Sequence, residues 1–175
     1  DDGGGGGTGQ QQPPAKVTVG GTIAGLAGSG LVLQNNGGDD LAVTANGTFT
    51  FKTSVDAGSP YNITVVAQPT APSQFCSIAN PAGTATNNVT SVTINCSTGS
   101  FSVGGTVSGL SGSGLVLRNN GGDDLSIASN GSFTFATELA SGSAFAVTVA
   151  TQPTRPAQTC TVADASGTIG GGGVR

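Results

Sequence analysis

The sequence predicts an all-β protein made of two tandem β-sandwich domains, the second of which lacks its last strand. Short runs alternate Val, Ile and Thr with small or polar residues, which is the pattern of a half-buried pleated strand. Turn-forming Asn, Gly and Pro separate these runs at intervals of about 8–12 residues. The sequence also repeats itself, and no segment shows a sustained helical period.

The repeat has a constant offset of 84 residues, so Asn35–Leu41 (NNGGDDL) recurs unchanged as Asn119–Leu125. About 38 of roughly 68 aligned positions are identical, and the alignment needs no gap. We therefore predict a flexible Gly/Pro-rich extension over residues 1–16, a first sandwich over residues 17–98 (the first repeat) and a second, incomplete sandwich over residues 99–175 (the second repeat).

Seven short strands are expected in the first repeat. They span Val17–Ile23, Gly30–Gln34, Leu41–Ala45, Thr48–Thr53, Tyr61–Ala67, Gln74–Ala79 and Val89–Cys96. Asn35–Gly38 and Asn46-Gly47 contain residues that tolerate positive φ, so both are predicted to be hairpin turns. Phe49 and Phe51, like Phe133 and Phe135, alternate with Thr and should face the core because alternate residues share one face of a strand.

Two of the three cysteines, Cys76 and Cys96, lie in the last two predicted strands of the first repeat. A disulfide between them would close a loop of about 20 residues and imply an oxidising compartment. The alternative is a pair of buried free thiols. Cys160 aligns with Cys76 but has no matching partner, so we expect it to be unpaired or bonded to a cysteine outside this sequence.

The equivalent of Val92–Cys96 is missing from the second repeat, because Arg175 aligns with Ser91. The second repeat should therefore present an open sheet edge and an apolar groove. One explanation is that the chain is a fragment of a longer array. The other is that a neighbouring subunit supplies the strand, with residues around Thr8–Val19 as the donor, so that subunits form a fibre.

Composition excludes several functions. The chain has no His, which rules out Ser–His and Cys–His catalysis, and we do not expect an enzyme. Its five basic residues are scattered singly, whereas nucleic-acid binding needs a basic patch. Its apolar runs are too short to span a membrane.

The remaining candidate sites are the two Asn-Asn-Gly-Gly-Asp-Asp hairpins. Asparagine and aspartate oxygens are calcium ligands, and a calcium or ligand site here would use Asn36, Asp39, Asp40, Asn120, Asp123 and Asp124. The alternative is a solvated hairpin, because adjacent aspartates on a strand point to opposite faces and no distal Glu completes a calcium loop. We expect no other cofactor.

The order of these features resembles a broad family of sandwiches. A Gly-Gly-Thr strand at Gly20–Thr22, a Leu-rich strand, the Asn-Gly-Asp turn and the strand Gly47–Phe51 occur in the same order in immunoglobulin-like and transthyretin-like domains, such as carboxypeptidase regulatory domains and collagen-adhesin B-type repeats. Tandem repeats of bacterial surface lipoproteins are also similar. The resemblance covers residues 17–169.

This resemblance implies an extracellular or cell-surface structural module, either a stalk, a spacer or a fibre unit, that contacts neighbouring repeats or other copies of itself. The alternative is an adhesive module that binds a ligand through its hairpins. Some collagen-adhesin domains carry Lys–Asn isopeptide cross-links, but Lys52 aligns with Ala136, so a cross-link common to both repeats is excluded.

Overall fold

The structure, a computed structural model, describes residues 12–175. All regular elements in these residues are strands, and no helix occurs among them. The strands of the first repeat are β1 (Lys16–Val17), β2 (Val19–Ala24), β3 (Leu31–Asn35), β4 (Asp39–Val43), β5 (Gly47–Thr50), β6 (Val55–Asp56), β7 (Ser59–Ala67), β8 (Gln74–Ala79), β9 (Ala82–Ala85) and β10 (Val89–Thr98). Those of the second repeat are β11 (Ser100–Phe101), β12 (Gly104–Val107), β13 (Leu115–Asn119), β14 (Asp123–Ile127), β15 (Gly131–Thr134), β16 (Leu139–Ala140), β17 (Ala144–Thr151) and β18 (Ser166–Thr168). Residues 1–11 of the predicted N-terminal extension lie outside the described residues.

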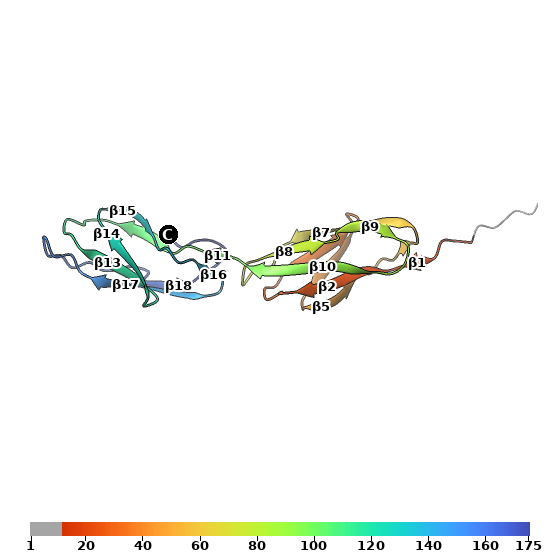
Figure 1. Cartoon of the computed structure of the whole chain (residues 1–175), viewed down its shortest axis with the longest axis horizontal. Coiled ribbons are helices and arrows are strands. Elements are labelled where there is room, and N and C mark those ends of the chain that lie inside the picture. Colours follow the sequence, from red (N-terminus) through yellow and green to blue (C-terminus); the bar gives the residue numbers. More distant parts are fainter. Residues whose placement is uncertain (1–11) are drawn as a thin grey trace, which may run out of the picture.

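Two four-stranded sheets form most of the first repeat, in the orders β5-β2-β10-β8 and β4-β3-β7-β9 (Figure 1). Strand β10 lies inside its sheet, parallel to β2 and antiparallel to β8. Both sheets contribute to one buried apolar cluster, with Val19 and Ile94 from the first sheet and Leu33 and Ile63 from the second. The prediction of an all-β fold is therefore confirmed, and the arrangement is consistent with a β-sandwich.

Most predicted strands are present, with small shifts at their ends. The strand Gln74–Ala79 has the predicted bounds. The predicted strand Val17–Ile23 is interrupted at Thr18, where β1 leaves to pair with β6. Strand β9 was not predicted, because Ala82–Ala85 (AGTA) carries no large apolar residue. It pairs with β7 and completes the second sheet.

The two predicted hairpins have different outcomes. Residues Asn36 and Gly37 adopt φ values of 50° and 73° and connect the antiparallel pair β3–β4, as predicted. The prediction of a hairpin at Asn46-Gly47 is wrong, because β4 and β5 belong to different sheets. The Asn46 side chain instead accepts a hydrogen bond from the Leu26 backbone N–H and donates one to the Leu26 carbonyl, which fixes the crossing between the sheets.

The second repeat reproduces one sheet of the first and leaves the other incomplete. The order β14-β13-β17-β18 corresponds strand for strand to β4-β3-β7-β9. On the other side, β12 pairs with β15 alone. The segment 158–163, which aligns with β8, forms no strand. Among residues 12–175, no strand of the second repeat corresponds to β10. The expected open edge is wrong in its position, because the open side of β12 faces the segment 158–163 and is not the outer edge of a sheet.

The four phenylalanines of the Phe-Thr-Phe segments turn toward the core. Phe51 and Phe135 are each 2% exposed, and Phe49 is also buried. The rings pack edge to face, with centroids 5.8 Å apart for Phe49–Phe51 and 5.7 Å for Phe133–Phe135. Phe133 is only half-buried, and no counterpart of β10 lies beside β12 among residues 12–175.

The two repeats are joined end to end with almost no linker (Figure 1). Strand β10 ends at Thr98 and β11 begins at Ser100, so Gly99 alone separates them. Gly99 donates its N–H to the Ser73 carbonyl of the first repeat and accepts a hydrogen bond from the Ser141 N–H of the second. The two repeats therefore share hydrogen bonds at the junction as well as the covalent chain.

Among residues 12–175 there is no helix of the length and apolarity that crossing a membrane requires.

Candidate functional site

A groove of about 530 Å³ lies in the second repeat where the first repeat holds β10. One wall is β12 and the other is the segment 158–163. Its apolar lining comes from both sides of the module and includes Val107, Phe133, Val149 and Val162. The expected apolar groove is therefore present, although it is a slot within a sheet and not an edge.

Comparing burial in the two repeats shows that the groove exposes residues that belong to the core in the first repeat. Eight residues of the second repeat are half-buried although their counterparts in the first repeat are buried. The pairs, with the first-repeat residue given first, are Val17 and Phe101, Gly20 and Gly104, Gly21 and Gly105, Ile23 and Val107, Leu26 and Leu110, Phe49 and Phe133, Gln74 and Gln158, and Cys76 and Cys160. The exposed surface is thus the surface that β10 and its surroundings cover in the first repeat.

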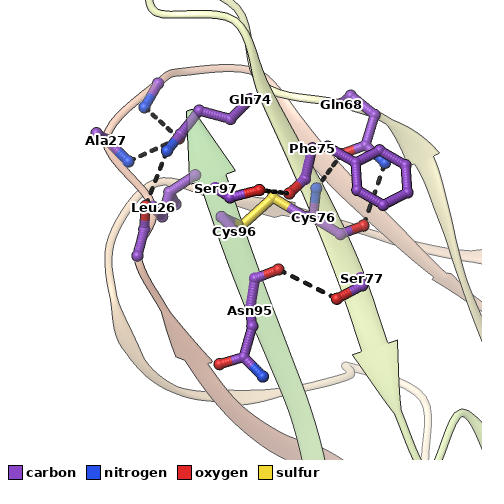
Figure 2. Close-up of a disulfide and its surroundings, with 12 residues drawn as sticks. Leu26, Ala27, Gln68, Gln74, Phe75, Cys76, Ser77, Asn95, Cys96 and Ser97 are labelled. Carbon is purple, nitrogen blue, oxygen red and sulfur yellow. Dashed lines mark hydrogen bonds between the residues drawn. A yellow bond between two sulfur atoms is a disulfide. The ribbon is translucent and has the colours of Figure 1, made fainter. Parts of the chain in front are cut away.

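In the first repeat, the structure joins Cys76 and Cys96 in a disulfide bond between β8 and β10 (Figure 2). The two residues are direct partners in the antiparallel register of these strands. The predicted pairing is therefore present. The disulfide fastens the strand that the second repeat lacks.

Two glutamines hold β8 in place beside this disulfide (Figure 2). The buried Gln74 accepts hydrogen bonds from the N–H groups of Ala27 (2.8 Å) and Gly28 (2.7 Å) and donates to the Gly25 carbonyl (2.8 Å). Gln68 accepts from the Cys76 N–H (2.8 Å) and donates to the Cys76 carbonyl (3.2 Å). These bonds satisfy backbone groups that no strand partner reaches.

The second repeat keeps the same support although the neighbouring strand is absent. Gln158 accepts from the N–H groups of Ser111 (2.8 Å) and Gly112 (2.7 Å) and donates to the Gly109 carbonyl (2.9 Å). Gln152 accepts from the Cys160 N–H (2.8 Å) and donates to the Cys160 carbonyl (3.0 Å). The segment 158–163 is therefore held in the position of β8 without any strand pairing.

Cys160 is a half-buried free thiol on the wall of this groove. It occupies the place that Cys76 has in the first repeat, where the partner Cys96 comes from β10. Within the described residues it has no disulfide partner, in agreement with the sequence alignment.

The Asn-Gly-Gly-Asp hairpins use their side chains to brace neighbouring strands. Asn36 donates to the Pro60 carbonyl (3.1 Å), and Asp39 accepts from the Thr53 N–H (2.9 Å). Asp40 accepts from the Gln34 side-chain amide (2.6 Å). The carboxylates of Asp39 and Asp40 thus bind different groups. No group of three or more His, Cys, Asp or Glu side chains suited to a metal occurs in the part of the chain that the structure describes.

The second hairpin repeats this arrangement with one change of charge. Asn120 donates to the Ala144 carbonyl (3.1 Å), and Asp123 accepts from the Thr137 N–H (3.0 Å). Asp124 forms an ion pair with Arg118, whose Nη2 lies 2.8 Å from Oδ2. The guanidinium lowers the pKa of the Asp124 carboxyl, first through the side-chain hydrogen bond and further through its charge.

Replacing Arg118 should reverse this shift. Arg118→Gln introduces the residue that the first repeat has at Gln34, and we expect the pKa of Asp124 to rise toward the ordinary aspartate value. Because the shift is downward, any contribution of the pair to stability is present at neutral pH and lost in acid. Carboxyl-carbon NMR titration measures the pKa directly. Arg155→Gln, a change at an exposed arginine outside the hairpin, is the control, and an unchanged Asp124 pKa in Arg118→Gln would contradict the assignment.

Sequence reasoning missed the residues that brace the groove and the junction. Gln68, Gln74 and their counterparts look like ordinary polar strand-end residues, yet their recurrence at the same offset was visible in the alignment. Ser141 is a different case, because its counterpart is Ala57. The hydroxyl of Ser141 has no equivalent in the first repeat. This difference between the repeats is the signal that could have identified Ser141 as a contact of the junction.

The chain matches no protein-family model and no curated protein, so its function is inferred from its own sequence and geometry.

Proposed function

We propose that this chain is a structural module of an extracellular fibre or cell-surface stalk, formed by two tandem immunoglobulin-like β-sandwich domains. The observation that carries the proposal is the junction. A single residue, Gly99, separates the last strand of the first repeat from the first strand of the second. Flexible inter-domain linkers contain more residues and make fewer contacts, so this connection favours a stiff rod over two independent domains.

Side-chain hydrogen bonds further restrict the junction. The hydroxyl of Ser141 accepts from the Ser73 N–H of the first repeat (2.9 Å) and donates to the Gly170 carbonyl of the second (2.7 Å). Ser141 is buried, and its counterpart Ala57 has no such hydroxyl. The Ser141 hydroxyl is therefore a contact specific to the junction, and the side chain at the equivalent position of the first repeat cannot make it.

The surface composition is that of a spacer. Among residues 12–175, Val66 and Phe75 are the exposed large apolar side chains. Adhesive surfaces are usually enriched in aromatic residues, whereas the other phenylalanines here are buried or half-buried. The hairpin carboxylates are also engaged within the chain, which gives the adhesive alternative less support. The Cys76–Cys96 disulfide supports an extracellular location, because such bonds persist in oxidising compartments.

Removing the Ser141 hydroxyl should loosen the rod without unfolding either repeat. The hydroxyl makes two hydrogen bonds, each worth about 0.5–1.5 kcal/mol, so Ser141→Ala should lower the melting temperature of the second repeat by several degrees and leave both repeats folded. Backbone ¹⁵N relaxation reports the rotational diffusion of each repeat separately. We expect both repeats of the unmodified chain to follow one anisotropic tensor, and those of Ser141→Ala to diverge from it. Ser126→Ala, at an exposed serine of β14, should behave like the unmodified chain.

Independent tumbling of the two repeats in the unmodified chain would contradict the stalk proposal. Electron microscopy of the native material tests the assembly that the proposal implies, since a stalk or fibre should form rods or filaments and not compact particles.

A further inference from the structure

Three residues at the junction form a closed ring of hydrogen bonds. Ser73 donates its N–H to the Ser141 hydroxyl (2.9 Å), Ser141 donates its N–H to the Gly99 carbonyl (2.8 Å), and Gly99 donates its N–H to the Ser73 carbonyl (3.0 Å). Ser141 belongs to the second repeat, whereas Ser73 directly precedes β8 and Gly99 directly follows β10. The ring therefore closes only while the start of β8 and the end of β10 stay side by side.

These two ends are held together by a short two-stranded ribbon, which consists of residues 74–76 of β8 and residues 96–98 of β10. Strand β10 pairs with β2 only as far as Asn95, which lies opposite Ala24. Beyond that point, within the described residues, β10 pairs with β8 alone, and β8 is the end strand of its sheet. Because two strands without a third are only marginally stable in water, the pairing of the ribbon is by itself a weak support for the junction.

The Cys76–Cys96 disulfide crosses the base of this ribbon (Figure 2). Each cysteine lies three positions from the ring of hydrogen bonds, since Cys76 follows Ser73 and Cys96 precedes Gly99 at that distance. The two strands cannot separate at the disulfide while the bond is intact. The bond therefore suppresses the open states of the ribbon, in which Ser73 and Gly99 would move apart.

Gln74 is the other support of the ribbon. Besides its bonds to the loop 25–28, its side chain donates to the Thr98 hydroxyl (3.3 Å). Apart from the strand pairing itself, this long bond is a weak link between the two strands. Breaking the disulfide should nevertheless leave the sandwich assembled, because Val92 and Ile94 of β10 are completely buried in its core. The ribbon can thus open while the rest of the first repeat stays folded.

We propose that the Cys76–Cys96 disulfide is a redox switch of the junction. When the bond is formed, the ribbon holds Ser73 and Gly99 in register, the ring with Ser141 is closed and the two repeats move as one rod. When the bond is reduced, the ribbon opens and the repeats move independently.

A dithiol is the class of reductant that this switch requires. Cys96 is half-buried whereas Cys76 is 2% exposed, so an incoming thiolate reaches the Cys96 sulfur first. Its attack forms a mixed disulfide with Cys96 and releases the Cys76 thiolate, which takes up a proton. The second thiolate of the reductant then attacks its partner sulfur, closes a cyclic disulfide and releases the Cys96 thiolate, which is also protonated. The protein disulfide is reduced to two thiols, and the dithiol is oxidised to one disulfide.

This inference concerns the regulation of the proposed stalk and rests on the rigidity of its junction. The test uses the full chain with Cys160→Ala, so that Cys76 and Cys96 are the only cysteines. Backbone ¹⁵N relaxation is measured without urea, before and after treatment with a small dithiol. Before reduction, both repeats should follow one anisotropic tensor. After reduction, they should diverge from it, and the amide hydrogens of Gly99 and Ser141 should exchange at least about tenfold faster.

Three controls separate opening of the ribbon from general destabilisation. The fluorescence of the buried Tyr61 should keep its native value after reduction, because the first repeat stays folded. Ile63→Ala, with the disulfide intact, lowers the stability of the first repeat by removing a buried side chain of the other sheet, yet it should keep the single tensor. Reoxidation with a low-molecular-weight disulfide should restore the single tensor in the reduced chain.

The outcomes distinguish the switch from the stalk. A single tensor before and after reduction, with unchanged exchange at Gly99 and Ser141, would overturn the switch and leave the stalk proposal intact. Loss of the native Tyr61 fluorescence on reduction would also overturn it, because the disulfide would then hold the whole first repeat and not the ribbon. Independent tumbling in the oxidised chain would contradict the stalk proposal itself, and the switch with it.

Discussion

Replacing Phe51 with alanine should destabilise the first repeat by about 3–5 kcal/mol, which is the usual cost of removing a buried phenylalanine ring. Phe51 is 2% exposed and packs edge to face on Phe49, with ring centroids 5.8 Å apart. The ring belongs to the single apolar cluster of this repeat, to which both sheets contribute. A loss of this size is a large part of the stability of a small domain, so we expect the first repeat to be mostly unfolded or close to it.

The sequence offers a convenient probe of this effect. The chain has one tyrosine and no tryptophan, and the tyrosine, Tyr61, is buried in the first repeat. Tyrosine fluorescence during urea denaturation therefore follows the first repeat alone. Phe135→Ala, the equivalent change in the second repeat, should leave the tyrosine transition in place, and Phe75→Ala should too, because Phe75 is 65% exposed. A tyrosine transition that is unchanged in Phe51→Ala would show that the ring contributes little to this core.

The orientation of these rings was predictable because it depends on local information. Alternation along one strand is enough to place Phe49 and Phe51 on one face. The strand Gln74–Ala79 and the turn at Asn36-Gly37 follow from local signals in the same way, since apolar alternation and tolerance of positive φ are properties of a few adjacent residues.

The position of β10 was not predictable from such signals. Its parallel pairing with β2 joins residues about 70 positions apart, such as Val19 and Val89. Apolar alternation gives the faces of a strand but not its neighbours in the sheet. The missing strand of the second repeat was therefore expected at an edge, while the structure shows an interior slot with a wall on each side.

Asn46 illustrates a second limit of prediction from local sequence signals. Asn-Gly between two strands is a strong hairpin signal, yet here the chain passes from one sheet to the other, and Asn46 binds the backbone of Leu26. A residue that tolerates a turn can equally use its amide to satisfy a distant backbone group. The choice between these uses depends on tertiary structure, which a few adjacent residues do not encode.

The candidate site was predictable only by comparing the two repeats. Within one repeat nothing marks Cys160 or Gly105 as unusual. The alignment shows that Cys160 lacks the partner that Cys76 has, and the structure adds that Gln152 and Gln158 hold the wall of the slot in place. The missing partner of Cys160 was visible in the sequence, whereas the hydrogen bonds that hold the segment 158–163 in place were visible only in the structure.

Reducing the Cys76–Cys96 disulfide should destabilise the first repeat by roughly 3 kcal/mol, because the bond closes a loop of 20 residues and its loss restores the entropy of the unfolded chain. The effect should be confined to that repeat, since the second has only the free thiol of Cys160. The experiment uses Cys160→Ala, which leaves a single pair of cysteines. We expect its tyrosine-detected urea transition to fall to lower urea on reduction, and Cys96→Ala to show the lower midpoint without reductant.

Counting reactive thiols tests the Cys76–Cys96 bond without a measurement of stability. Unfolded without reductant, the unmodified chain should have one reactive thiol, from Cys160, and Cys160→Ala should have none. Three thiols in the unmodified chain would show that Cys76 and Cys96 are a buried reduced pair. In that case reduction would not shift the transition, and β10 would be held by its strand pairing and its apolar side chains alone.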